Sequence, residues 1–433
     1  MCHPSADSAH VPIATTAPAP ATPGGSDLSL AAVITEGWLH CVYQTFVDLD
    51  SGHVVAHEAL LRGPARTRWA SPLFLLDAAR ADGLLVDLEQ ASLRASVADA
   101  SRLSDGRPIT LFVNVEPTTL TERPEVVLEA IANRAPHVQV VVEITERALA
   151  TDIAGVLAGA ERLREAGCAI ALDDVGVEPE SLAFIPLLRP EVVKLDLRLL
   201  RSVNDVATQT VASAVRAYAE QSGAEVVAEG IETSDDLTRA LVLGATLGQG
   251  WFWGRGERHF QTTVPQPERF RATPNGAILR ATPYELLGRA RRVRRAPKHL
   301  LLAQSHALEL MAMQSQVPPL LLATFEHARF FTAATVARYV TMGRHLPFVG
   351  VFGIDMPRTP APGVRGSALD PQDPLAAEWT VVVLGAHEAA ALMARDLGDT
   401  GPDREREFEF VVTHDRGLVT AAAQSLVGRL ARC

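Results

Sequence analysis

The sequence predicts an α/β protein in which a TIM-like (β/α)8 barrel is followed by a smaller α/β domain. Short apolar runs rich in β-branched residues alternate with Ala-, Leu- and Arg-rich stretches of helical spacing. This pattern is typical of a parallel sheet covered by helices. The alternation extends over about 230 residues, a length that favours a barrel, although an open doubly wound sheet would show similar spacing.

The apolar runs mark the expected strands of the barrel, at residues 54–61, 109–115, 138–144, 169–172, 192–195 and 225–228. Helical spacing is clearest at 153–165 and 199–221. The second domain begins with helical segments at 284–295 and 300–313. It continues with apolar runs at 348–352, 379–384 and 408–412, and with helices such as 386–395.

Composition sets the expected boundaries. Residues 1–27 are rich in Ala, Pro, Thr and Ser and predict a disordered tail. The barrel is expected at 28–260 and the smaller domain at 282–430. Residues 261–281 contain three prolines and few apolar positions, which indicates a linker.

The net charge and the cysteines indicate which classes of partner and which cellular location to expect. The net charge of −11 argues against generic binding to duplex DNA. The Arg-rich run at 289–298 is most simply a solvated helix face or hinge, with a nucleic-acid contact as the minor alternative. Four scattered cysteines, no secretory signal and no apolar run of about 20 residues predict a cytoplasmic protein without a membrane span.

Polar side chains follow the apolar runs at the point where each expected strand ends. These residues are Glu58, Asn114, Glu143, Asp173, Asp174, Lys194, Glu229 and, after a turn, Gln249. Each of them alone has an ordinary interpretation as a surface residue, a turn or a helix cap. In a TIM-like barrel, however, the carboxyl ends of the strands meet at one face, so the sequence predicts an acidic cup there.

The chemistry of such a cup follows from its residue types. Converging carboxylates repel one another unless cations occupy the cup or some of them hold protons. Oxygen ligands alone favour Mg²⁺, Mn²⁺ or Ca²⁺ over Zn²⁺. Two such ions suit displacement at phosphorus. Lys194 could orient or deprotonate the attacking water, and Arg62 could hold a phosphate.

At these residues the sequence resembles the EAL family of cyclic di-GMP phosphodiesterases. Seven motifs recur in the family's order: HEALLRG (57–63), LFVNVEP (111–117), VVEITERAL (141–149), ALDDVG (171–176), VVKLD (192–196), AEGIET (228–233) and GQGWFWGRG (248–256). The resemblance covers about residues 30–258. It implies a barrel whose first strand is antiparallel, a homodimer contact, and hydrolysis of cyclic di-GMP to linear pGpG.

The resemblance also implies a role for each matching residue. Glu58, Asn114, Glu143 and Asp173 would hold Mg²⁺ or Mn²⁺, and Asp174 would hold a second ion. Lys194 would hold the attacking water, supported by Glu229, and these two with Glu58 form the implied catalytic set. Gln44, Leu60, Arg62 and Gln249 would contact the dinucleotide. Glu146 would brace the loop that follows the paired aspartates.

That loop is where the sequence departs from the family. After Asp173 and Asp174 the family pattern is Phe-Gly, then Thr or Ala, then Gly-Tyr-Ser-Ser, whereas here residues 175–181 read VGVEPES. Proline stiffens this segment, and two glutamates add negative charge near an anionic substrate. The alternative function is therefore a weak or inactive EAL domain that acts as a cyclic di-GMP receptor or a protein-interaction module.

Residues 282–430 resemble the DICT domain, a sensory module seen with cyclic di-GMP enzymes. The stretches that carry the resemblance are 321–339, 369–385, 390–399 and 408–419. The resemblance implies an unknown ligand or partner and control of the barrel by this domain. Glu378 and Trp379 are candidates for binding, although a structural role is the simpler interpretation of Trp379.

Overall fold

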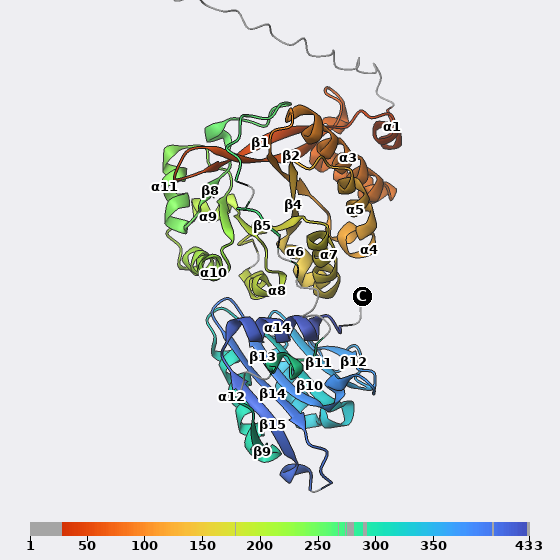
Figure 1. Cartoon of the computed structure of the whole chain (residues 1–433), viewed down its shortest axis with the longest axis vertical. Coiled ribbons are helices and arrows are strands. Elements are labelled where there is room, and N and C mark those ends of the chain that lie inside the picture. The colour runs from red at the N-terminus through yellow and green to blue at the C-terminus, as the bar shows by residue number, and fades with distance from the viewer. Residues whose placement is uncertain are drawn as a thin grey trace, which may run out of the picture.

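The computed structural model describes residues 28–177, 179–266, 268–272, 274, 281–288, 292–400 and 402–430. The predicted tail at 1–27 lies outside these ranges. Figure 1 shows two units stacked along the longest axis, a barrel and a sheet covered by helices, with α14 between them. Among the helices of the described ranges, none combines the length and the apolar character needed to span a bilayer.

Eight strands close the barrel in chain order. They are β1 (His40–Asp48), β2 (Val54–Arg62), β3 (Ile109–Asn114), β4 (Val138–Thr145), β5 (Ala169–Val175), β6 (Val192–Leu195), β7 (Glu225–Ala228) and β8 (Leu247–Gly248). Strand β1 runs antiparallel to both β2 and β8, and the remaining neighbours are parallel. The TIM-like barrel with an antiparallel first strand is therefore confirmed, and the open sheet is excluded.

Helices cover the outside of the barrel (Figure 1). They are α1 (Leu30–Thr35), α2 (Pro72–Asp82), α3 (Leu85–Leu103), α4 (Pro117–Glu122), α5 (Pro124–Ala132), α6 (Glu146–Thr151), α7 (Ile153–Glu165), α8 (Ile185–Leu188), α9 (Leu197–Arg201), α10 (Val206–Ser222) and α11 (Ser234–Leu243). Their apolar faces hold these helices against the barrel. In helix α7, for example, Val156, Ala160 and Leu163 repeat at helical spacing and are all buried. The helical spacing at 199–221 is divided between α9 and α10.

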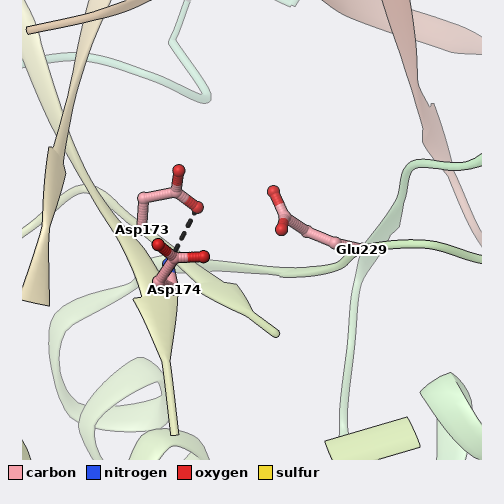
Figure 2. A group of neighbouring side chains, drawn as sticks. All are labelled: Asp173, Asp174 and Glu229. Carbon is pink, nitrogen blue, oxygen red and sulfur yellow. Dashed lines mark hydrogen bonds between the residues drawn. The ribbon is translucent and has the colours of Figure 1, made fainter. Parts of the chain in front are cut away.

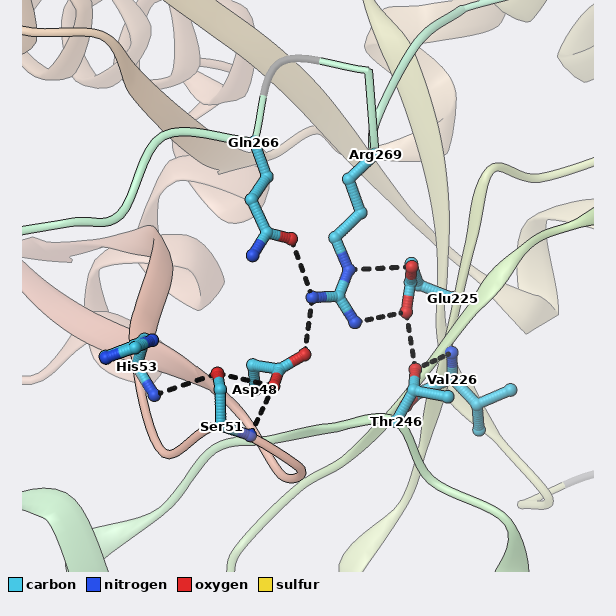
Figure 3. Close-up of polar contacts among 8 residues, drawn as sticks. All are labelled: Asp48, Ser51, His53, Glu225, Val226, Thr246, Gln266 and Arg269. Atoms are coloured by element: carbon cyan, nitrogen blue, oxygen red, sulfur yellow. Dashed lines mark hydrogen bonds and ion pairs between the residues drawn. The ribbon is translucent and has the colours of Figure 1, made fainter.

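The barrel floor is built in part by residues after the last strand. Phe270 is fully buried inside the barrel, where its ring lies 5.5 Å from that of Phe112. Arg269 donates to Asp48 at the end of β1 and, through two nitrogens, to Glu225 at the start of β7 (Figure 3). The segment 261–281, predicted as a linker from its prolines, therefore begins as part of the barrel.

Replacing Arg269 by alanine is expected to destabilise the barrel at pH 7 by about 2–4 kcal/mol, because two largely buried carboxylates lose their partner. Burial opposes ionisation of Asp48, but Ser51 and Arg269 outweigh it and lower the Asp48 pKa to about 2. This stabilisation is present above the ordinary pKa of 3.8 and is lost as the pH falls toward 2. Urea unfolding at pH 7 and pH 3 would measure it.

The control is Arg271→Ala, since Arg271 forms an ion pair that is exposed to solvent. This variant should unfold within about 0.5 kcal/mol of the parent. Equal losses in the two variants would contradict the role given to Arg269.

The second unit is a mixed sheet with helices on both faces, which confirms the smaller α/β domain. Its strands are β9 (Arg294–Pro297), β10 (Leu320–His327), β11 (Val349–Ile354), β12 (Arg365–Ala368), β13 (Glu378–Leu384), β14 (Ala389–Asp396) and β15 (Glu407–Thr413), in the spatial order 12-11-10-13-14-15-9. Helix α14 (Arg416–Val427) packs on one face, and α12 (Lys298–Gln314) and α13 (Ala333–Met342) pack on the other.

Two helix predictions in this unit are wrong. The segment 386–395 contains β14, which pairs along its length with β13 and β15. Alanine favours helices only weakly, and pairing at the centre of a sheet overrides that preference. Where a helix was predicted at 284–295, the described residues of that range form a short 3-10 turn at Glu285–Leu287 and the start of the edge strand β9. Arginines on an edge strand discourage pairing with other chains.

The two units meet where α8 lies against α14 (Figure 1). Gln424 on α14 donates to the carbonyl of Leu187 at 2.7 Å, and both residues are buried. The rings of Phe184 and Phe348 approach edge to face at 6.2 Å. Apolar residues of the two units form one continuous core here. The contact is therefore a packed interface.

Candidate active site

Strand periodicity directs the predicted polar residues into the barrel. In the parallel strands each lies two positions after a residue whose side chain fills the interior, as Asn114 follows Phe112 and Glu143 follows Val141. Alternate residues of a strand share one face, so these side chains point to the same space. The same relation holds for Glu58, Asp173, Lys194, Glu229 and Gln249 and, in the antiparallel β1, for Gln44, which precedes Phe46 by two.

Lys194 lies at the centre of the acidic cup. Its ammonium is buried and lies 2.6 Å from Glu229, 2.8 Å from Glu143, 3.2 Å from Asp173 and 3.7 Å from Glu58. Four strands, β2, β4, β5 and β6, and the residue after β7 supply these groups. One cation therefore faces four carboxylates that are far apart in the sequence.

Glu58 is held in place by two amides. Asn114 donates to Glu58 Oε1 at 2.9 Å, and Gln249 donates to Glu58 Oε2 at 2.6 Å. Gln249 also lies 3.4 Å from Gln44 Oε1. These contacts fix the orientation of the Glu58 carboxylate at the mouth of the barrel.

Three carboxylates open toward one another at the end of β5 and after β7 (Figure 2). One oxygen from each of Asp173, Asp174 and Glu229 lies within 4.8 Å of the other two. Asp174 adopts a left-handed backbone conformation, with φ of 59°, which is uncommon for a residue other than glycine. Its backbone amide donates to Asp173 Oδ1 at 2.9 Å, so the two aspartates are oriented by their own turn.

The cup carries more carboxylates than one lysine balances. Burial, and then the charge of Glu58, raise the pKa of Glu143 well above its usual range. Burial raises the pKa of Glu229 to about 8, against the attraction of Lys194. The pKa of Lys194 is also raised despite its burial, because Asp173 and Glu143 favour its charged form. Lys194 Nζ lies 2.8 Å from Glu143 Oε1, whereas Oε2 makes no hydrogen bond within the part of the chain that the structure describes.

The residues of the cup fit hard divalent cations. Among the described residues the ligand atoms within reach are all oxygens, Glu143 Oε2 is buried without a hydrogen bond, and the surplus charge is negative. In the absence of a cation, protons on Glu143 and Glu229 reduce the repulsion. Glu58, Asn114, Glu143, Asp173, Asp174 and Glu229 are the residues that could hold such ions.

Glu146 contacts the loop that follows the paired aspartates. Its Oε2 accepts hydrogen bonds from Ser181 Oγ at 2.6 Å and from the amide of Gly176 at 3.2 Å. Gly176 has φ of 103°, and a side chain there would collide with Leu199. Of the altered segment, Glu178 lies outside the described residues. Glu146 therefore contacts both ends of the loop, Gly176 and Ser181, although the residues between them differ from the family pattern.

A cavity of about 220 Å³ adjoins the cup and is lined by Leu60, Arg62 and Asn114. Its wall includes Glu89 of α3, which the sequence patterns did not reveal as a candidate. Glu89 is buried, accepts a hydrogen bond from the backbone amide of Glu116, and has one oxygen without a hydrogen-bond partner among the described residues. Burial raises its pKa to about 7. A lone acid within a helix carries no signal in the sequence.

A family model described as EAL domain matches residues 27–256, more than half of the chain. The chain belongs to the EAL domain family. A second model, described as a sensory domain in diguanylate cyclases and two-component systems (DICT), matches residues 284–397.

Curated relatives match the EAL domain at modest identity. The cyclic di-GMP phosphodiesterase PA2567 of Pseudomonas aeruginosa is 31% identical over 226 residues, which is 51% of this chain and 38% of that protein. The cyclic di-GMP phosphodiesterase RocR of the same organism is 29% identical over 235 residues, which is 52% of this chain and 60% of that protein. This chain thus spans less than two thirds of either relative.

Solved EAL structures are also similar. The PaMucR phosphodiesterase in complex with c-di-GMP is 25% identical, with a TM-score of 0.48 over 53% of this chain and 95% of that chain. The complex of Klebsiella pneumoniae BlrP1 with manganese and cy-diGMP is 26% identical, with a TM-score of 0.45 over 51% of this chain and 56% of that chain.

Proposed function

We propose that this chain is a divalent-metal-dependent phosphodiesterase that hydrolyses cyclic di-GMP to pGpG. The observation that supports the proposal most strongly is the position of Lys194 among Glu58, Glu143, Asp173 and Glu229 at the mouth of the barrel. Membership of the EAL family and the names of its relatives favour the same substrate.

The proposed chemistry is in-line displacement at phosphorus. Bound Mg²⁺ or Mn²⁺ would supply charge that stabilises the attacking and leaving oxygens. Lys194 holds the attacking water, and Glu229, 2.6 Å from Lys194 Nζ, supports it. The water oxygen bonds to phosphorus, the bond from phosphorus to the 3′ oxygen breaks, and that oxygen takes a proton. One water is consumed, and the product is the linear dinucleotide.

Binding of the nucleotide is assigned to residues beside the cup. Leu60 and Arg62 line the adjoining cavity, where Arg62 can form paired hydrogen bonds to a phosphate. Gln249 contacts both Glu58 and Gln44, and the amide groups of the two glutamines can bond a base or a phosphate.

Incubation of the full chain with cyclic di-GMP and Mn²⁺ should yield pGpG, measured by chromatography, and EDTA should stop the reaction. EDTA removes the ions that offset the charge of the cup, so it should also lower the melting temperature. The altered loop at 175–181 favours a second candidate, a receptor that binds without hydrolysis. Tight binding by calorimetry with no product would establish the receptor and contradict the enzyme.

The C-terminal domain is proposed to control turnover through α8. Six residues separate Asp174 from Ser181, and the chain then continues through buried Leu182, Ala183 and Phe184 into α8. Helix α8 contacts α14 of the other domain. A movement of α14 can therefore reach the paired aspartates through one short segment of the chain, provided that a ligand binds two states with different affinity.

Replacing Gln424 by glutamate should change kcat or KM by about 5-fold or more, within the usual range of coupling between sites. The substitution removes the amide that donates to the carbonyl of Leu187 and places a carboxylate, which has no proton to donate, against that carbonyl. Steady-state kinetics of the full chain would measure the change. The control is Gln221→Glu, at an exposed position of α10. Identical kinetics in parent and both variants would contradict control through this contact.

The proposal also includes a cellular location and an oligomeric state. A cytoplasmic location is supported by Cys41 and Cys168, which are buried free thiols. A homodimer stays a prediction of the family resemblance, and light scattering of the full chain would measure it.

A further inference from the structure

The C-terminal domain contains a cavity of about 240 Å³ between its sheet and the helices α12 and α13. It lies on the face of the sheet opposite to α14. Ala323 of β10 and Val381 of β13 form its base, while their neighbours Leu322 and Val382 point to the α14 face. The cavity is thus separate from the acidic cup and from the contact between the domains.

Four aromatic side chains line the cavity, beside charged and hydroxyl-bearing ones. They are Phe325, Phe330, Tyr339 and Trp379. Ring contacts hold several of them in place, with Phe325 and Tyr339 at 5.6 Å and Trp379 against Phe408 at 5.7 Å. Fixed rings of this kind favour a flat aromatic occupant, since stacked or edge-to-face pairs add to the energy of burial.

The charged side chains of the lining are already neutralised within the protein. Arg338 pairs with Glu309 at 2.7 Å, Lys298 with Asp403 at 2.6 Å, and Glu326 with Arg406 at 3.0 Å. A charged ligand would have to break one of these pairs or remain without a counter-ion. The pairing therefore favours an uncharged ligand.

One polar group of the lining lacks a partner. The Tyr339 side chain is fully buried, and its hydroxyl makes no hydrogen bond among the described residues. Burial, and then the nearby carboxylate of Glu309, raise the pKa of Tyr339 well above its usual range, so the hydroxyl stays protonated. The Glu309 carboxylate is itself engaged by Arg338 at 2.7 Å, so a ligand oxygen within hydrogen-bond distance of the Tyr339 hydroxyl could supply an acceptor and recover free energy.

We propose that this cavity binds a small, uncharged aromatic compound that carries a hydrogen-bond acceptor for Tyr339. The volume limits its size. An apolar cavity of about 150 Å³ holds benzene, so a cavity of about 240 Å³ suits a bicyclic compound. The binding does not depend on whether the barrel hydrolyses cyclic di-GMP, and an effect of the ligand on turnover would require the coupling proposed above.

Calorimetry of the full chain with three probes tests the proposal. The probes are 1-indanone, which has the acceptor, indane, which lacks it, and benzoate, which is charged. 1-Indanone is expected to bind saturably with a Kd below about 1 mM, and more tightly than either of the other probes. No saturable binding of 1-indanone, or tighter binding of benzoate, would overturn the proposal.

Two variants locate the bound probe. Tyr339→Phe removes only the hydroxyl, so the variant should fold normally. Its affinity for 1-indanone should be about 3- to 10-fold weaker, and its affinity for indane should be unchanged. Ser305→Leu fills the cavity from α12, where Ser305 is buried in the wall, and should abolish binding of both probes. Unchanged 1-indanone affinity in both variants would show that the probe binds elsewhere and overturn the assignment.

Discussion

Replacing Lys194 by methionine is expected to lower kcat for cyclic di-GMP by about 10²-fold or more, while the nucleotide still binds. Methionine has a similar length but no charge and no proton to donate. The ammonium that lies between 2.6 and 3.7 Å from four carboxylates would be lost, and with it the group proposed to hold the attacking water. Chromatography of the product would give kcat, and calorimetry would give the nucleotide affinity.

The same variant should lose stability when metal is removed. Lys194 is the cation closest to Glu143 and Glu229, so without it their repulsion grows. Added Mn²⁺ should therefore raise the melting temperature more in Lys194→Met than in the parent. Arg201→Met, at an exposed position of α9, is the control. An unchanged kcat in Lys194→Met would exclude the assigned role.

Replacing Glu143 by glutamine is expected to have opposite effects on stability and on activity. Activity should fall by about 10²-fold or more, because a buried ligand of the proposed metal site loses its charge. Stability of the metal-free protein should rise by on the order of 1 kcal/mol or more at pH 8. The reason is that burial holds the pKa of Glu143 well above its usual range, so the ionised form is costly in the folded state.

The raised pKa of Glu143 determines how the free energy of unfolding changes with pH. The folded protein keeps the proton on Glu143 after the unfolded chain has released it, so this carboxyl reduces stability as the pH rises above the ordinary value of 4.5. The advantage of Glu143→Gln should vanish below about pH 4. Denaturant unfolding without metal at pH 4 and pH 8 would measure it. Glu129→Gln, at an exposed position of α5, should change stability by about 0.5 kcal/mol or less at both pH values.

Family motifs explain why so many site residues could be found in the sequence. The strands from β2 to β7 are short β-branched runs, and a polar residue follows the interior positions of each. Period-two alternation then fixes the direction of the side chain, a rule that needs no tertiary information. Gln44 was implied only by the resemblance, because β1 runs in the opposite direction and carries its site residue at its centre instead of its carboxyl end.

Other features depended on the assembled fold. Residues 261–281 read as a linker because of their prolines, yet Phe270 fills the floor of the barrel and Arg269 joins β1 to β7. Truncating the chain after Gln261 to isolate the barrel would remove both residues. Such a truncation would therefore measure the stability of the barrel and not its regulation by the C-terminal domain. Glu89 is a further case, since only packing brings it beside Arg62 and Asn114.

The sequence by itself determined the order of strands β2 to β7, the acidic residues at the mouth of the barrel and the presence of a second α/β domain. Local periodicity and motif order carry that information. Tertiary structure alone decided that 389–396 is a strand, that Lys194 touches four carboxylates, and that α8 meets α14. Each of these depends on groups distant in the chain, whose pairing, charge and burial become favourable only once the core has formed.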